Sequence, residues 1–252
     1  MNYRRLPLEG LYNVRDLGGH PVPGGGATRF GRFIRSALPQ GATDSDLAFL
    51  KDYGVTVSID FRGDREVERQ PSCFDGLPWI KYLRSPTFNA QVAFAAKASV
   101  GSSRPAMDAF VKWGEKYIEL TDDCRDWVCA TLTMMAASDG AVIYNCTTGK
   151  DRTGLISALL LGLAGVDYAD IIADYCVSEV YLTAIYNELI AAYLARWPDR
   201  EAKPENPFFK TAPENMSVLL AHLDGKYGGI EPYIRACGVG DDTIAKLRRQ
   251  LI

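Results

Sequence analysis

One stretch decides the fold of this chain: Asn145-Cys146-Thr147-Thr148-Gly149-Lys150-Asp151-Arg152-Thr153-Gly154. It follows a short apolar run, residues 141–144, and precedes a longer apolar run that begins at residue 155. A β-branched run cannot stay extended through Thr-Thr-Gly-Lys-Asp, and the second run is long enough for a buried helix. The stretch therefore predicts a strand, a tight loop and a helix, with Cys146 at the C-terminal end of the strand.

The spacing from Cys146 to Arg152 suits the chemistry of phosphate. Five residues separate the two, so that one loop can wrap a single tetrahedral oxyanion. The unpaired N–H groups and the positive dipole end of a helix N-terminus favour anions, including a cysteine thiolate. The thiolate would attack phosphorus while the loop N–H groups and the Arg152 fork hold the phosphate oxygens. We therefore expect Cys146 to be a nucleophile, Arg152 to bind the phosphoryl group and Thr153 to hydrogen-bond the sulfur.

Two other interpretations of the stretch compete with this one. Residues 149–150 are similar to the end of a nucleotide-binding loop of the form GxxxxGK[ST], which needs Gly at 144 and Ser or Thr at 151. The sequence has Tyr144 and Asp151, so that pattern fails twice. A lone cysteine at a strand end is most often a small buried residue. The residues that follow Cys146 at these spacings favour the phosphate loop instead.

The loop resembles that of a known family, the cysteine-dependent protein tyrosine phosphatases. Within this superfamily it is most similar to bacterial tyrosine, dual-specificity and phosphoinositide phosphatases whose loop reads His-Cys-x-x-Gly-Lys-Asp-Arg-Thr-Gly. Weaker similarity covers almost the whole chain, in the segments Asn13-x-Arg15-Asp16-Leu17-Gly18-Gly19, Arg35-Ser36-Ala37, Asp174-Tyr175 with Ser178, and Tyr227-Gly228-Gly229-Ile230-Glu231-x-Tyr233. The resemblance implies hydrolysis of a phosphomonoester through a phosphocysteine, as in a protein tyrosine or dual-specificity phosphatase. A phosphoinositide phosphatase and a non-catalytic, phospho-ligand-binding pseudophosphatase are the alternatives.

The resemblance also implies roles for residues of the loop. It implies that Cys146, Arg152 and Asp151 are catalytic, with Asp151 as the general acid or a positioning group. The residues expected to bind phosphate or substrate are Thr147, Thr148, Gly149, Lys150, Thr153 and Asp60. A second positive charge from Lys150 at the mouth of the loop would suit a substrate with additional phosphates, such as a phosphoinositide. The alternative for Lys150 is a solvent-facing loop lysine.

Asn145 is the one departure from the subfamily loop, which has His at this position. A histidine can hold the loop by hydrogen bonds and add partial positive charge near the thiolate, whereas asparagine supplies only the hydrogen bonds. We therefore expect the thiolate of Cys146 to form less readily than in relatives, and the pH optimum to lie higher.

Asp60 and Asp64 are the other candidates for the general acid. The β-branched run 55–61 predicts a strand that leads into a charged loop, residues 62–66. Loops at the carboxyl ends of strands in an open α/β sheet converge on the ligand site, so these carboxylates would lie near the phosphate loop. The alternative is that they belong to a solvated charge cluster.

The remaining pattern predicts a single α/β domain over residues 1–252, with a central, mostly parallel sheet flanked by helices. Strands are expected near 30–36, 55–61, 79–83 and 141–144. Helices are expected near 44–53, 107–120, 123–137, 155–164, 167–177, 178–197, 214–227, 231–237 and 241–252. In the loop-rich start of the chain, Arg15 and Asp16 are expected to form a local ion pair.

Residues 88–103 are Ala-rich and weakly amphipathic. Their place between two core elements suggests a lid over the phosphate loop, with Phe88 or Phe94 covering a substrate ring. The alternative is a surface helix that packs Val92 and Phe94 into the core.

The composition is that of an ordinary globular chain, with 252 residues, 47% hydrophobic residues and a net charge of −3. This charge gives no broad attraction for nucleic acid or anionic membrane, so any attraction for a phosphorylated ligand must be local. The partner that the resemblance implies is a phosphorylated protein or phosphoinositide substrate. Six cysteines without a CxxC pair fit reduced thiols, and with only two histidines neither a metal site nor a cofactor is expected. We see no signal peptide and no membrane-spanning run, which predicts no stable membrane insertion and a cytoplasmic location, with export by another route left open. No oligomeric state is predicted.

Overall fold

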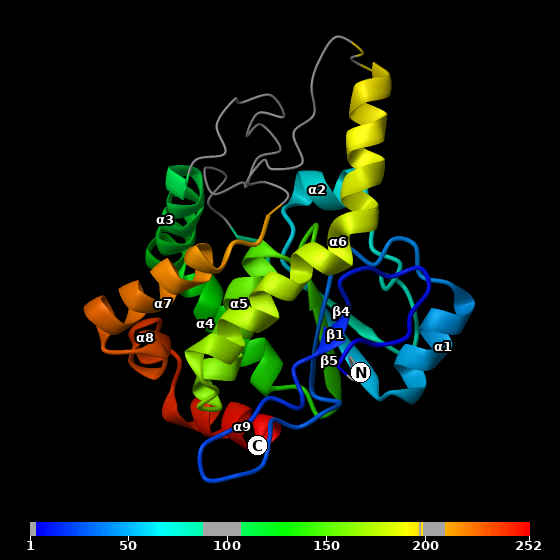
Figure 1. Ribbon diagram of the computed structural model, residues 1–252. Helices are drawn as coiled ribbons and strands as arrows, with labels where there is room; N and C mark the ends of the chain where they lie inside the picture. Colours follow the sequence, from blue (N-terminus) through cyan, green and yellow to red (C-terminus); the bar gives the residue numbers. More distant parts are fainter. Residues whose placement is uncertain (1–3, 88–106, 197, 199–209) are drawn as a thin grey trace.

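A five-stranded sheet in the order β1-β2-β5-β3-β4 forms the centre of the molecule (Figure 1). The computed structural model describes residues 4–87, 107–196, 198 and 210–252. The strands are β1 Arg15–Asp16, β2 Phe33–Ser36, β3 Val55–Asp60, β4 Lys81–Arg84 and β5 Ala141–Asn145. The pairs from β2 to β4 are parallel, and β1 pairs antiparallel with β2 at one edge. The predicted mostly parallel sheet is confirmed, whereas the two-residue strand β1 has no sequence pattern that predicts it.

Helices cover both faces of this sheet. They are α1 Asp44–Asp52, α2 Asp64–Arg69, α3 Met107–Asp123, α4 Arg125–Ala136, α5 Asp151–Leu163, α6 Tyr168–Arg196, α7 Pro213–Tyr227, α8 Ile230–Ala236 and α9 Asp241–Leu251. Figure 1 shows α1 on one side of the sheet and α4, α5 and α7 to α9 on the other. Alternate residues of β5 divide between two cores: Val142 and Tyr144 join the larger one, Ala141 and Ile143 the smaller one beside α1. A strand buried on both faces reads as a continuous apolar run, as this one does.

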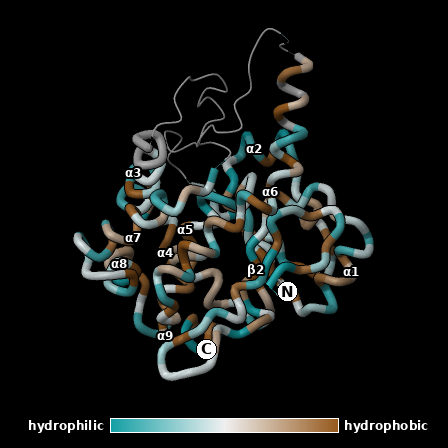
Figure 2. The backbone as a smooth tube through the Cα atoms, in the orientation of Figure 1, coloured by the Kyte–Doolittle hydropathy of each residue, from teal (hydrophilic) through white to brown (hydrophobic). Residues whose placement is uncertain are grey.

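The helix α5 runs through the larger core. Every residue from Leu155 to Leu161 is buried, and Figure 2 shows hydrophobic segments of α4 and α5 inside the molecule. Burying a leucine or isoleucine side chain contributes about 1.5–3 kcal/mol. This packing holds the axis of α5, and with it the position of its first turn, where the loop after β5 ends.

Two predicted elements are wrong in extent. The charged loop predicted at 62–66 gives way at Asp64 to the helix α2, because the Glu66 carboxylate accepts a hydrogen bond from the Gly63 backbone N–H at 2.9 Å and caps the first turn. The two helices predicted at 167–177 and 178–197 are one helix, α6. Residues 168–196 contain neither Gly nor Pro, so that nothing in this part of the sequence interrupts the helix.

The predicted ion pair between Arg15 and Asp16 is also wrong. Both residues lie in β1, where consecutive side chains point to opposite faces. Arg15 reaches Asp174 on α6, with Nε 2.8 Å from Oδ1. Asp16 instead accepts hydrogen bonds from the Gly31 backbone N–H and the Tyr53 hydroxyl, at 2.7 and 2.8 Å. Each residue thus binds its own partner on its own side of the strand.

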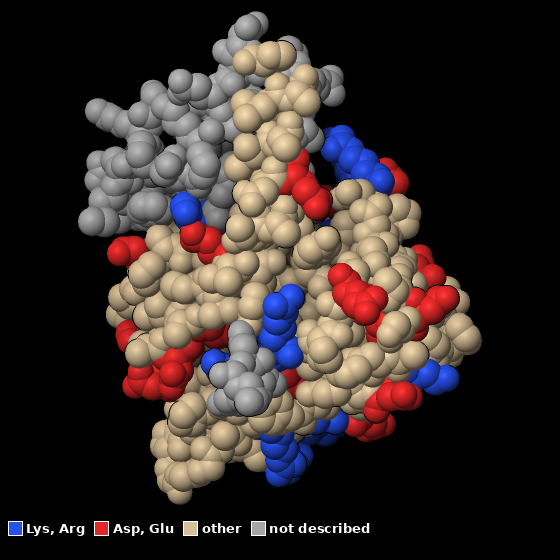
Figure 3. All heavy atoms as spheres, turned by 45° about the vertical axis from the view of Figure 1, so that its right-hand side comes forward, with Lys and Arg blue, Asp and Glu red and all other residues tan. Residues whose placement is uncertain are grey.

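The segment predicted as a lid, with Phe88 and Phe94, lies outside the described residues. In the ranges that the structure describes, no helix combines the length and apolar character needed to cross a bilayer. On the face drawn in Figure 3, acidic and basic side chains are interspersed.

A buried ion cluster joins the sheet to α6. Arg15 and Arg35 both contact Asp174, with the Arg35 Nη1 atom 2.6 Å from Oδ2, and all three side chains are at most 3% exposed. Burial alone would raise the pKa of Asp174, but the positive charges of Arg15 and Arg35 outweigh it and hold the pKa well below its usual range. The ionised carboxylate therefore compensates two buried guanidinium groups.

Replacing Asp174 by Asn removes the charge that both arginines face, and we expect the free energy of unfolding to fall by about 3–5 kcal/mol. Because the folded pKa lies below the unfolded value of about 3.9, the wild type keeps this stabilisation above that pH and loses it as the pH falls further. Urea unfolding should show a larger difference between variant and wild type at pH 7 than at pH 3. The control is Asp52→Asn at an exposed position, with an expected change within about 0.5 kcal/mol. Equal effects of the two substitutions would contradict the assignment.

Candidate active site

The strand, loop and helix predicted around Cys146 are present. β5 lies between β2 and β3 and ends at Asn145, and α5 begins at Asp151. Cys146 follows the strand directly and is 2% exposed. The N-cap residue of α5, Lys150, makes no side-chain hydrogen bond to the first turn of the helix. Its N–H groups therefore remain available to an anion at the end of the central strand.

The carbonyl groups of the loop are bound from outside. The Leu38 backbone N–H donates to the Thr147 carbonyl at 3.0 Å. The Asn13 side-chain amide donates to the carbonyls of Thr148 and Gly149, at 3.0 and 3.1 Å. In a trans peptide the N–H points away from the carbonyl of the same peptide unit. Each of these three contacts therefore turns the next N–H toward the inner side of the loop.

The donors that hold the loop are themselves held. Arg35 donates to the Gly149 carbonyl at 2.8 Å and to Asp174 through its other terminal nitrogen. Arg15 donates to the Asn13 side-chain oxygen at 2.5 Å, which leaves the Asn13 amide pointing at the loop. Asn13 has a φ of 54°, a left-handed conformation that asparagine tolerates better than most residues. The ion cluster around Asp174 thus supports the loop.

Gly149 is required by its surroundings as well as by its backbone. Its φ is 67°, and a Cβ added there would lie 2.3 Å from the Ser36 carbonyl oxygen. Any side chain would therefore push the loop away from β2.

Arg152 is clamped by Glu66. Its terminal nitrogens donate to the two Glu66 oxygens at 2.9 and 2.8 Å, and Nη1 also donates to the Phe61 carbonyl at 3.0 Å. The Thr147 hydroxyl donates to Glu66 at 2.5 Å. The Nε–H of Arg152 has no partner among the residues the structure describes. Nη2 also donates to the Thr147 hydroxyl at 3.3 Å, so the clamp engages both terminal nitrogens and leaves the Nε–H for a ligand.

The charges of this clamp persist over a wide pH range. Burial alone would raise the pKa of Glu66, but the hydrogen bonds and the charge of Arg152 outweigh it and lower the pKa to about 2. Burial likewise opposes the charged form of Arg152, yet the hydrogen bonds with Glu66 and the charge of Cys146 raise its pKa above the usual value.

Asp151 is held by two side chains of α3. Its Oδ1 atom accepts hydrogen bonds from Trp113 Nε1 at 3.1 Å and from the Tyr117 hydroxyl at 2.6 Å. The residue is 8% exposed. Asp151 therefore lies at the edge of the loop with one carboxylate oxygen fully engaged.

Lys150 is neither a solvent-facing lysine nor an open charge at the mouth of the loop. It is 1% exposed, and its Nζ lies 3.7 Å from Asp151 Oδ1 and 5.2 Å from the centroid of the Trp113 ring. It donates to the Lys210 carbonyl at 3.4 Å. Burial lowers the pKa of Lys150, although the charges of Asp151 and Cys146 oppose this shift.

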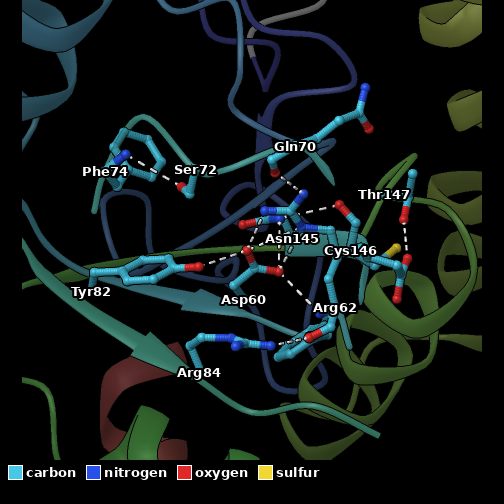
Figure 4. Close-up of polar contacts among 12 residues, drawn as sticks. Asp60, Arg62, Gln70, Ser72, Phe74, Tyr82, Arg84, Asn145, Cys146 and Thr147 are labelled. Carbon is cyan, nitrogen blue, oxygen red and sulfur yellow. Dashed lines mark hydrogen bonds and ion pairs between the residues drawn. The ribbon is translucent and has the colours of Figure 1, made fainter. Parts of the chain in front are cut away.

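Asp60 lies next to the loop but its carboxylate is occupied. Arg62, two residues after Asp60, binds both oxygens of this carboxylate, with Nη2 2.7 Å from Oδ2. The Tyr82 hydroxyl also donates to Oδ2, at 2.9 Å. Asn145 donates to Asp60 at 3.4 Å and to the Cys146 carbonyl at 3.1 Å. Figure 4 shows Asp60 between Arg62, Tyr82 and Asn145, with Cys146 beyond them. Asn145 thus supplies the hydrogen bonds expected at its position.

Asp64 and Thr153, the other two residues predicted to take part in the reaction, lie in different surroundings. Asp64 is 77% exposed and pairs with Arg84 at 2.9 Å, at the surface. Thr153 is fully buried, and its hydroxyl forms no hydrogen bond with Cys146 or any other described residue. The structure therefore brings the residues from Cys146 to Thr153 together on one loop and helix start, places Asp60 behind Asn145, and leaves Asp64 apart.

Several contributors to the site are not singled out by sequence reasoning as site residues: Asn13, Arg35, Glu66, Trp113 and Tyr117. Asn13 and Arg35 stand in segments that carry the family resemblance, which could have marked them. Trp113 and Tyr117 are four residues apart and so share one helix face. Glu66 follows Gly63 by three residues, the spacing of a helix cap.

The family of the chain is shown by comparison with known proteins. A family model described as the tyrosine phosphatase family matches residues 6–252. The chain belongs to this family, which confirms the resemblance of its loop.

Curated relatives agree with this assignment. A tyrosine-protein phosphatase of Nostoc commune is 29% identical over 224 residues, which cover 87% of this chain and 74% of the relative. The triple specificity protein phosphatase PtpB of Mycobacterium tuberculosis is 27% identical over an alignment of 285 residues that covers both chains completely. Among solved structures, Pseudomonas aeruginosa TpbA covers 83% of this chain and 87% of its own, with 16% identity and a TM-score of 0.39. The chain is an enzyme of the tyrosine or dual-specificity phosphatase class, as predicted.

Replacing Gly149 by Ala should disrupt the loop, because the new Cβ meets the Ser36 carbonyl. We expect the free energy of unfolding to fall by roughly 1–3 kcal/mol, together with loss of p-nitrophenyl phosphate hydrolysis. Gly225→Ala is the matched control, because Gly225 lies inside α7 and a Cβ there has nothing within 4 Å. That variant should gain up to about 1 kcal/mol. Thermal unfolding and activity of both variants check the prediction, and a stable, active Gly149→Ala would contradict it.

Proposed function

We propose that this chain hydrolyses phosphomonoesters in two steps through a phosphocysteine at Cys146, with phosphotyrosine in proteins as the preferred substrate. The observation that carries the proposal is the loop whose carbonyls are bound from outside by Leu38, Asn13 and Arg35. A phosphate held by the inward N–H groups of Thr148, Gly149 and Lys150 would meet the thiolate and the Nε–H of Arg152 together. Thr147 would act by fixing Glu66.

In the first step the Cys146 thiolate attacks phosphorus and the bond from phosphorus to the leaving oxygen breaks. Asp151 donates its proton to that oxygen, so that an alcohol or phenol departs. The loop N–H groups and Arg152 stabilise the charge on the three remaining phosphate oxygens. These groups neutralise the charge without a metal ion.

In the second step water attacks the phosphocysteine. The phosphorus–sulfur bond breaks, and Asp151, now a carboxylate, accepts a proton from the attacking water. Thr153, whose buried hydroxyl is unpaired among the described residues, would donate a hydrogen bond to the departing thiolate. Inorganic phosphate leaves and the free enzyme is restored.

Asp60 takes an indirect part in this proposal. Because Arg62 and Tyr82 occupy its carboxylate, it would orient Asn145 and the start of the loop, not bind phosphate. Asp64 has no part in the reaction, since it is exposed and paired with Arg84.

The surroundings of Lys150 support a protein substrate. A phosphoinositide phosphatase remains the alternative, but the buried Lys150 no longer supplies an open second charge for an additional phosphate. A panel of phosphotyrosine, phosphoserine and phosphothreonine peptides with soluble phosphoinositides distinguishes the two. Phosphotyrosine peptides should have the highest kcat/KM, and a higher value for a phosphoinositide would reverse the assignment.

The proposed location is the cytoplasm, supported by six cysteines of which none is in a disulfide.

Replacing Cys146 by Ser should abolish hydrolysis of p-nitrophenyl phosphate, because serine has no thiolate to attack phosphorus. Acid quenching of wild type with radiolabelled substrate should trap a labelled protein, and the variant should trap none. Cys73→Ser, at another free cysteine, should keep wild-type activity. A pseudophosphatase would show no difference between wild type and Cys146→Ser.

Replacing Asp151 by Asn should keep the fold, because the amide oxygen can accept the same hydrogen bonds from α3. The variant has no proton to give, so kcat/KM for phenyl phosphate should fall by about 10²- to 10⁴-fold. The loss should be much smaller for 2,4-dinitrophenyl phosphate, whose leaving group departs without a proton. Equal losses for the two substrates would assign the general acid elsewhere.

A further inference from the structure

The two oxygens of Asp151 have different surroundings. Oδ1 accepts from Trp113 Nε1 at 3.1 Å and from the Tyr117 hydroxyl at 2.6 Å, and it is also the oxygen nearest to Lys150 Nζ, at 3.7 Å. Oδ2 has no hydrogen-bond partner in the described part of the chain, and it is not among the buried unpaired atoms. Solvent therefore reaches Oδ2.

The donors to Oδ1 cannot easily reverse their direction. An indole N–H can only donate, so Trp113 fixes Oδ1 as an acceptor. Tyr117 belongs to a buried chain: the Asn215 amide donates to the Tyr175 hydroxyl at 3.2 Å, and that hydroxyl lies 2.7 Å from the Tyr117 hydroxyl. The Tyr117 hydroxyl has one proton and donates it to Asp151, so the Tyr175 hydroxyl donates to Tyr117. Every hydrogen bond in this series, from Asn215 through Tyr175 and Tyr117, therefore donates in the direction of Asp151 Oδ1.

The donors that hold the Asp151 carboxylate are buried and come from one helix face. Tyr117 and Tyr175 are each 1% exposed and Asn215 is fully buried. Trp113 and Tyr117 lie four residues apart on α3, so both reach Asp151 from the same helix face. Burial and the negative charge of Asp151 raise the pKa of Tyr117 well above its usual value, which keeps its hydroxyl a donor.

We propose that Trp113 and Tyr117 are positioning residues that reserve Oδ1 as an acceptor and so place the transferable proton of Asp151 on Oδ2. The inference rests on the proposed function, in which Asp151 is the general acid. In the first step the Oδ2–H bond breaks, its electron pair stays on Oδ2, and the proton passes to the leaving oxygen. The carboxylate that forms is stabilised at Oδ1 by two donors already in place. In the second step Oδ2 receives the proton of the attacking water.

A purely structural role is the competing explanation, because the same hydrogen bonds also attach α3 to the start of α5. The two roles differ in their dependence on the leaving group. A loss of packing slows every substrate alike, whereas a displaced Oδ2 slows only substrates whose leaving oxygen needs a proton.

The test is kcat/KM of Tyr117→Phe and Trp113→Phe with phenyl phosphate and with 2,4-dinitrophenyl phosphate. Each variant removes one hydrogen bond to a group that becomes charged, so we expect kcat/KM for phenyl phosphate to fall about tenfold in each. With the dinitrophenyl ester we expect less than about twofold, because that step needs no general acid. Tyr233→Phe is the matched control, since it also removes one buried hydroxyl, which donates to the Thr121 carbonyl at 2.8 Å. It should affect both substrates equally and weakly.

Equal losses on both substrates, or no loss on phenyl phosphate, would overturn the positioning role. Failure of the proposed function looks different, because wild type would then fail on both substrates or Cys146→Ser would keep its activity.

A second measurement serves if Tyr117→Phe does not fold. The indole N–H signal of Trp113, one of four tryptophans, should shift upfield in Asp151→Ala, as read by ¹⁵N–¹H NMR, with Trp113→Phe providing the assignment. An unchanged signal would overturn the contact on which the inference depends.

Discussion

Thr148 and Gly149 turn their carbonyls away from the inner side of the loop because the Asn13 amide binds both oxygens and Arg35 binds one of them. In a trans peptide group the carbonyl and the N–H point in opposite directions. Holding the carbonyls outside therefore directs the N–H groups inward before any phosphate is present. A loop that had to turn its peptides at the moment of reaction would lose much of this stabilisation.

The groups that hold the loop come from distant parts of the chain, and one carboxylate gathers them. Asp174 on α6 binds both Arg35 from β2 and Arg15 from β1, and Arg15 in turn holds Asn13. Three buried charges of this kind are stable only as a set, since removing one leaves another uncompensated. The enzyme thus uses an ion cluster, itself away from the substrate, to determine the shape of the phosphate loop.

The fold and the centre of the site follow from local sequence patterns, and the supporting contacts do not. The strand, the loop and the apolar helix α5 are predicted correctly in type and order, because each is determined by residues adjacent in sequence. The start of α5 is wrong by four residues, since the helix begins at Asp151 and not near residue 155. The continuous α6 and the start of α2 differ from prediction, since a helix end depends on a cap or a breaker that composition alone marks poorly. Asn13, Arg35 and Asp174 meet only in the folded chain, so similarity to the family marks their segments without showing that they form one cluster. The partners of the Asp60 carboxylate, Tyr82 and Asn145, likewise come close to it only in the folded chain, so the sequence does not show that it is occupied.

The Glu66 carboxylate does two things at once, since it caps α2 at Gly63 and clamps Arg152. A helix of six residues is short, and its first turn depends on that cap. Fraying of α2 would therefore release the guanidinium, and an anion that pulls Arg152 away would in turn loosen α2. The folding of this surface turn is thus coupled to the position of Arg152, so that a contact made on the outside of α2 would affect Arg152.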